Sequence, residues 1–246
     1  MTRNFACFAL ACALCTSAYA DELVIPPVEY PTLPVKGATA QAFVPSGWRL
    51  EYDVPGDLNR DGRDDRVLVL RMDDPANIVN NDGLGQPAFD TNPRMLVVVF
   101  AEDGGYRRVL EDHALIPRPD SPVMDDYLDG GDAVAVRRGA FKVRLHVWSS
   151  AGSWETGNTA LTFRHRDGCF RLIGYDTLSV NRASLEALST SIDYLTGRAV
   201  FSKENYQEDA PPVQKTARVP KRPLPCLEAI GDGFGFEPGV QSLFGG

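Results

Sequence analysis

Long apolar runs are scarce in this 246-residue chain. Beyond residue 20, none approaches the roughly 18 consecutive apolar residues that a membrane-spanning helix requires, so we expect no membrane span there. Residues 1–20 combine the basic Arg3, an apolar segment over residues 5–15 and the small-residue ending Ala18-Tyr19-Ala20. This pattern is typical of a secretory signal peptide cleaved before Asp21. We therefore predict a periplasmic or secreted protein.

Cysteine is also sparse once that segment is removed. Three of the five cysteines lie within residues 1–20, so only Cys169 and Cys226 remain. An oxidising compartment favours a bond between two such thiols, and closing a loop of this length contributes about 4 kcal/mol in the chain-entropy model. We predict a Cys169–Cys226 disulfide, and the alternative is two separate buried thiols.

Positive charge is in deficit. The chain has 25 Lys and Arg against 33 Asp and Glu, which gives a formal net charge of −8. A chain this acidic repels nucleic acid and anionic lipid. We therefore expect neither of them as a partner.

Catalytic motifs are missing as well. His113, His146 and His165 stand in no His-Glu-x-x-His or Cys-His spacing that would indicate zinc. Gly152-Ser153-Trp154-Glu155 does not match the Gly-x-Ser-x-Gly pattern of a nucleophile elbow. We expect no catalysis. The alternative is an envelope hydrolase with paired carboxylates, which sequence spacing cannot single out because separation in space defines such a pair.

What the chain does contain is a series of strand-like segments. Residues 66–72 and 95–100 are rich in β-branched residues and leucine, and residues 141–147 alternate apolar with polar side chains. Glycine-containing turns separate such segments, at residues 103–105, 138–139, 167–168 and 196–197. Turns at this rhythm favour antiparallel pairing. We predict an all-β fold, a mainly antiparallel sandwich or partly closed barrel of about eight strands.

This β domain is expected to span residues 47–206, between two proline-rich ends. Residues 21–46 predict an extended arm. Residues 207–246 predict a strap over the surface, rather than a strand, followed by a glycine-rich tail. Inside the domain, residues 182–189 are compatible with two helical turns.

The most specific pattern is Asp57-Leu58-Asn59-Arg60-Asp61-Gly62-Arg63-Asp64-Asp65. Calcium takes six to eight oxygen ligands at about 2.3–2.6 Å, and alternate residues of a tight loop can supply several of them. Gly62 permits the sharp reversal, because it adopts a positive φ without a Cβ clash. We predict a calcium site with side-chain oxygens from Asp57, Asn59, Asp61 and Asp65 and the backbone carbonyl of Arg63.

An EF-hand is not expected, because Leu68 stands at the twelfth loop position, where that motif needs a bidentate Glu. A calcium loop that runs directly into a strand resembles the loops of FG-GAP and VCBS-type repeats in extracellular β proteins. The resemblance covers residues 56–70. The alternative is a solvated acidic turn without metal, since Asp, Asn and Gly are also common turn residues.

A second candidate site surrounds Trp154. Its loop combines two tryptophans with small polar residues, and loops on a rigid sheet are frequent recognition sites. Trp154 can stack on a sugar or peptide, while Glu155 and Asn158 offer polar contacts. The alternative is structural, with Trp148 in the core and Trp154 at the edge of the sheet.

Three segments together look like a group of small secreted proteins of Gram-negative bacteria, namely residues 172–176, 191–197 and 222–227. The resemblance implies export, β structure and the calcium loop, and it supplies no mechanism. We expect a secreted, calcium-stabilised binding or structural module of the bacterial envelope. Its partner would be an envelope protein or a glycan.

Overall fold

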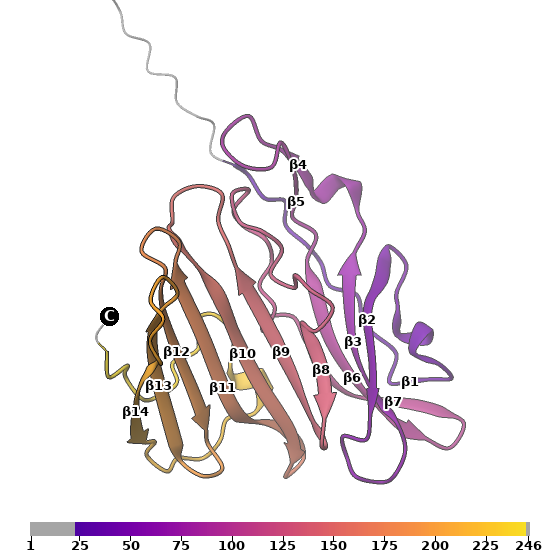
Figure 1. Ribbon diagram of the computed structural model, residues 1–246. Helices are drawn as coiled ribbons and strands as arrows, with labels where there is room; N and C mark the ends of the chain where they lie inside the picture. Colours follow the sequence, from indigo (N-terminus) through magenta and orange to yellow (C-terminus); the bar gives the residue numbers. More distant parts are fainter. Residues whose placement is uncertain (1–22, 245–246) are drawn as a thin grey trace, which may run out of the picture.

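The computed structural model describes residues 23–244 (Figure 1). The expected signal peptide therefore lies outside the described residues. The chain is almost entirely β, and all its strand pairs are antiparallel. The sheets do not close into a barrel, which corresponds to the sandwich alternative of the all-β prediction.

Two large sheets and one small sheet make up the fold. The five-stranded sheet has the order β1-β7-β6-β3-β2, with β1 (Lys36–Gly37), β2 (Trp48–Gly56), β3 (Asp65–Met72), β6 (Arg94–Glu102) and β7 (Gly105–Asp112). The seven-stranded sheet runs in sequence order from β14 back to β8, with β8 (Val134–Arg137), β9 (Ala140–Val147), β10 (Glu155–Arg166), β11 (Cys169–Asn181), β12 (Glu186–Asp193), β13 (Arg198–Asn205) and β14 (Val213–Arg218). A small hairpin pairs β4 (Ile78–Asn80) with β5 (Ala88–Asp90).

The five-stranded sheet is covered on both faces, as the apolar runs of its central strands predict. On β3, Val67 and Val69 join the main core between the large sheets, whereas Leu68 and Leu70 join a second cluster on the outer face. Leu33 and Phe43, which come from the N-terminal segment, also belong to that second cluster, and both are fully buried. The segment 21–46 is thus extended for most of its described length, but it also covers part of the sheet.

The seven-stranded sheet follows the expected alternation of apolar and polar residues. Phe141, Val143 and Leu145 on β9 are fully buried in the main core, and Lys142 and Arg144 between them are partly exposed. Such a strand has one face on the core and one in water.

The prediction of helical turns over residues 182–189 is wrong. Asn181 ends β11, and its side-chain oxygen accepts the N–H groups of Ala183 and Ser184, which forms a turn. From Glu186 the chain enters β12, which is paired with β11 on one side and β13 on the other. Two ladders of backbone hydrogen bonds outweigh the weak local helix propensity.

The segment 207–246 also differs from the expectation. Val213–Arg218 forms β14 at the edge of the sheet rather than an unpaired strap. The prolines near this strand lie outside its ladder, since residues 211 and 212 precede it and residue 220 follows it. The structure therefore has more strands than expected, fourteen within the described residues.

Beyond β14, the tail packs on the inner face of the seven-stranded sheet. Leu227, in the short 3-10 helix η3 (Leu227–Ala229), is fully buried, and Phe236 contacts Tyr175 with ring centroids 5.6 Å apart. Gly233 approaches the core so closely that an added Cβ would lie 2.6 Å from Leu145 Cδ1. The Cys169–Cys226 disulfide is confirmed, and it joins the start of β11 to this tail.

Candidate functional site

Residues 57–64, here named the acidic loop, connect β2 to β3 as a tight turn. Gly62 has φ +85°, in the region expected for the glycine of such a loop. Asp61 N–H donates to Asp57 Oδ1 (3.1 Å) and to Asn59 Oδ1 (2.9 Å), and Gly62 N–H donates to Asp57 Oδ2 (3.0 Å). The structure thus brings the oxygens of three predicted ligands, Asp57, Asn59 and Asp61, around one turn.

Asp65 has a different environment from these three residues. Its carboxylate is buried and accepts N–H groups from Leu58 (2.9 Å), Asn59 (3.2 Å) and Ala101 (2.9 Å). Burial raises its pKa in spite of these hydrogen bonds. Asp65 therefore ties the loop to β6.

Arg63, the remaining predicted ligand, uses its side chain to pair with Asp61 and with Asp103, the latter at 3.0 Å. The backbone N–H of Arg63 donates to Asp61 Oδ1, and this is the main cause of the lowered pKa of Asp61. Within residues 23–244, no three His, Cys, Asp or Glu side chains form a metal-binding group. The predicted calcium set depends on an amide and a carbonyl oxygen as well as on carboxylates, which are the hard donors that calcium accepts.

The surface around Trp154 contains only part of the second candidate site. Trp154 is 65% exposed, and Arg182 lies over both its ring and that of Trp148, at 6.0 and 5.0 Å from the ring centroids. Glu155 accepts hydrogen bonds from Ser179 and Asn181 (2.7 and 2.8 Å). Asn158 lies three residues further along β10, so its side chain is on the opposite face of the strand from that of Glu155.

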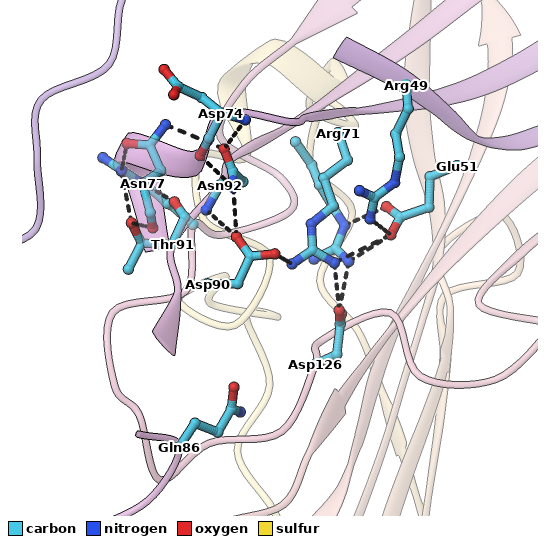
Figure 2. A network of polar contacts seen from close by, with 12 residues as sticks. Arg49, Glu51, Arg71, Asp74, Asn77, Gln86, Asp90, Thr91, Asn92 and Asp126 are labelled. Carbon is cyan, nitrogen blue, oxygen red and sulfur yellow. Dashed lines mark hydrogen bonds and ion pairs between the residues drawn. The ribbon is translucent and has the colours of Figure 1, made fainter. Parts of the chain in front are cut away.

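A polar network centred on the buried Arg94 joins β2, β3 and β6 to the loop before β8, and Figure 2 shows part of it. Arg94, at the start of β6, donates to both oxygens of Glu51 (2.6 and 2.9 Å) and to Asp126 Oδ2 (2.7 Å). Arg71, at the end of β3, pairs with Asp126 (3.1 Å) and with Asp90 (2.8 Å). The network ties both central strands to the loop that leads into β8.

Asp90 extends this network into the segment 73–93. Asn92 donates from its amide to Asp90 Oδ1 (2.7 Å), and Asn77 donates to Asn92 Oδ1 (3.2 Å). Arg118 in turn bonds Thr91 and, at the edge of the N-terminal arm, the carbonyl of Pro26. The polar segment 73–93 is therefore held by side-chain hydrogen bonds, shown in part in Figure 2.

Glu51 and Asp126 are two carboxylates that share Arg94 Nη2, so they are a natural test of the paired-carboxylate alternative. Burial acts to raise the pKa of Asp126, but the hydrogen bond and charge of Arg94 outweigh it and hold the pKa below its usual value. A glycosidase acid needs the opposite, a carboxyl group with a raised pKa. This pair is arranged as an ion-pair network.

We predict that Asp126 gives the fold an acid-sensitive component. A lowered folded-state pKa contributes stability that is fully present above the unfolded value of about 3.9 and is lost as the pH falls through the folded value. The difference in melting temperature between wild type and Asp126→Asn should thus be largest near neutral pH and shrink as the pH falls below about 4. Thermal melts across this range measure it, with Asp125→Asn as the control. A pH-independent difference for Asp126→Asn would contradict the prediction.

Arg71, Arg94 and Asp126 were not among the residues predicted from the sequence. The sequence did contain a signal for the two arginines. Each stands at one end of an apolar run, and the alternation of side chains along a strand puts it on the same face as the core residues. For Asp126 there was none, since its partners lie 32 and 55 residues away.

Two of the three histidines lie against aromatic rings. His165 contacts Phe100 and Phe170 at the edge of the main core, with ring centroids 4.9 and 5.2 Å apart. His113 stacks on Tyr30 of the N-terminal arm (4.0 Å), and burial lowers its pKa. These contacts are structural in character.

Fold and site together define an all-β sandwich with an Asp- and Asn-rich turn at the entrance to its central strand. No family model, no curated protein and no solved structure matches the chain. Within the described residues, no helix is long and apolar enough to cross a membrane.

Proposed function

We propose that this protein is a calcium-stabilised binding or structural module of the bacterial envelope, periplasmic or secreted, and that it performs no catalysis. The observation that carries the proposal is that the side chains of Asp57, Asn59 and Asp61 lie around the β2–β3 turn, where Asp57 and Asn59 accept its N–H groups and the Asn59 amide donates to Asp61 Oδ2 (3.1 Å). Calcium would supply positive charge that relieves repulsion among these oxygens. The calcium loops of extracellular modules are filled even when their affinity is modest.

The position of the loop supports a structural role for the ion. Leu58, inside the loop, is buried in the main core, and the next strand after the loop is the central β3. Ordering the turn therefore also holds Leu58 in place. An ion that binds only the folded state stabilises it by mass action, by about 2.7 kcal/mol at a hundred times the dissociation constant.

We predict that millimolar calcium raises the melting temperature of the wild type by roughly 5–10 °C relative to chelator, and that Asp61→Ala removes this increase. Asp64→Ala is the matched control, because Asp64 lies in the same loop, is exposed and is not an expected ligand. Magnesium should replace calcium poorly, since it requires a smaller octahedral site. Equal melting temperatures of the wild type in calcium and in chelator would favour the solvated turn.

The hydrolase alternative receives less support. Glu51 and Asp126 are locked in ion pairs with arginines. Three adjoining pockets beside the β10–β11 and β12–β13 turns have no Asp or Glu in their lining. A further pocket beside the β6–β7 turn contains Glu102 and Asp103, and both are paired with basic side chains. A binding partner, an envelope protein or a glycan, is therefore the better proposal than a substrate.

A further inference from the structure

The three adjoining pockets form one elongated groove, here named the basic groove. Their volumes are about 280, 410 and 290 Å³. The first and third share Arg166 and Leu195, and the first and second share Thr196. The groove thus runs from the acidic loop, past the β10–β11 hairpin, to β14.

Charge is distributed very unevenly around this groove. Although the whole chain has a net charge of −8, seven of its 25 basic residues line the groove and no acidic residue does. The seven are Arg60, Arg164, Arg166, Arg198, Arg218, Lys221 and Arg222. Such a concentration of one sign produces a local potential opposite to that of the remaining surface.

These cations are not held in close ion pairs within the protein. In the part of the chain that the structure describes, none of the seven forms an ion pair with Asp or Glu. Arg164 Nε is buried without a hydrogen-bond partner. Arg222 is held in position, since it donates to the carbonyl of Pro238 (3.1 Å) and lies over the ring of Tyr194.

We propose that the basic groove binds an acidic polysaccharide, a chain that carries carboxylate groups at regular intervals. This deepens the proposed binding function and rests on it. Six of the seven cations are arginines, whose planar forks bind carboxylates with two parallel hydrogen bonds. An elongated groove suits a polymer, and Thr196, Thr216 and Asn59 add polar groups for sugar hydroxyls.

Nucleic acid fits this groove less well. Single-stranded DNA binds through several aromatic rings on which bases stack. Tyr194 and His165 are the aromatic side chains in the lining; an arginine covers the first, and the second packs against phenylalanines. A duplex or an anionic membrane would also face the acidic remainder of the surface.

Fluorescence anisotropy with labelled oligogalacturonic acid tests the proposal, in chelator and again with calcium. Wild type should bind in both conditions, and affinity should fall when salt rises from about 50 to about 500 mM, because screening shortens the range of the attraction. Arg166→Glu with Lys221→Glu should weaken binding about tenfold or more. Both residues are exposed, so the folded core should be unaffected; this is checked by thermal melting.

The matched control is Lys36→Glu with Arg49→Glu, which makes the same change of net charge on the other sheet. It should leave affinity within about twofold, because it lies outside the groove. Equal weakening by both variants, or no binding by the wild type, would overturn the proposal. Tighter binding of the wild type to single-stranded DNA or to anionic vesicles would overturn the choice of ligand. Calcium-dependent melting is measured separately, so loss of the groove and loss of the calcium site are distinguishable.

Discussion

Replacing Arg94 with methionine should lower the free energy of unfolding by about 3–5 kcal/mol, the cost of breaking a buried ion pair by removal of one partner. The Arg94 side chain is 1% exposed, and its loss leaves Glu51, itself 18% exposed, without its bidentate partner. Arg71 compensates only in part, because it reaches Glu51 at 3.5 Å through a single nitrogen. Equilibrium unfolding in urea measures the difference.

Arg49→Met is the matched control, since Arg49 also faces Glu51 but is 46% exposed and 3.9 Å away. Exposed pairs of this kind contribute about 0–1 kcal/mol. In a double-mutant cycle, Glu51→Gln should make the Arg94 substitution less damaging, because the uncompensated charge is then absent. A loss below about 1 kcal/mol for Arg94→Met would show that the network adds no net stability.

The sequence was sufficient to predict features that depend on neighbouring residues. Alternation along 141–147 placed the half-buried strand β9, and the apolar run at 95–100 placed a strand covered on both faces. Both follow from the two-residue period of a strand. The disulfide was predictable by counting, because only two cysteines follow the expected signal peptide.

Features that depend on distant residues were not predictable in this way. Residues 186–189 belong to strand β12 because they pair with β11 on one side and β13 on the other. Residues 213–218 became β14 because β13 offered an open edge. Asp65 became an acceptor for Ala101, which lies 36 residues away on β6. In each case the partner exists only after the chain has folded.

The same limit applies to the basic groove. Its cations come from the acidic loop, from β10, from β13, from β14 and from the segment that follows β14. The composition is that of an acidic chain, which predicted repulsion of nucleic acid and anionic lipid. Net charge is a sum, however, and the structure separates the two signs in space.

The disulfide gives the second large expected effect, because it closes a long loop of the unfolded chain. Cys226 precedes η3, and around it Leu172 N–H donates to the carbonyl of Pro225 (3.0 Å) and Arg171 donates to that of Leu224 (2.7 Å). These two hydrogen bonds, together with buried Leu227, hold the start of the tail on β11. Opening the bond leaves them in place but frees 57 residues of chain in the unfolded state.

We predict that Cys169→Ala with Cys226→Ala lowers the free energy of unfolding by about 4 kcal/mol, the chain-entropy value for a loop of 57 residues. The melting temperature should fall by roughly 10 °C. Urea unfolding with and without reductant measures the effect: the wild type should lose stability on reduction and then match the double variant, which should not respond. The control is Cys7→Ala, which lies in the expected signal peptide and should leave the exported protein unchanged. Equal stability of oxidised and reduced wild type would mean that the contacts of Leu227 and its neighbours hold the tail without the covalent bond.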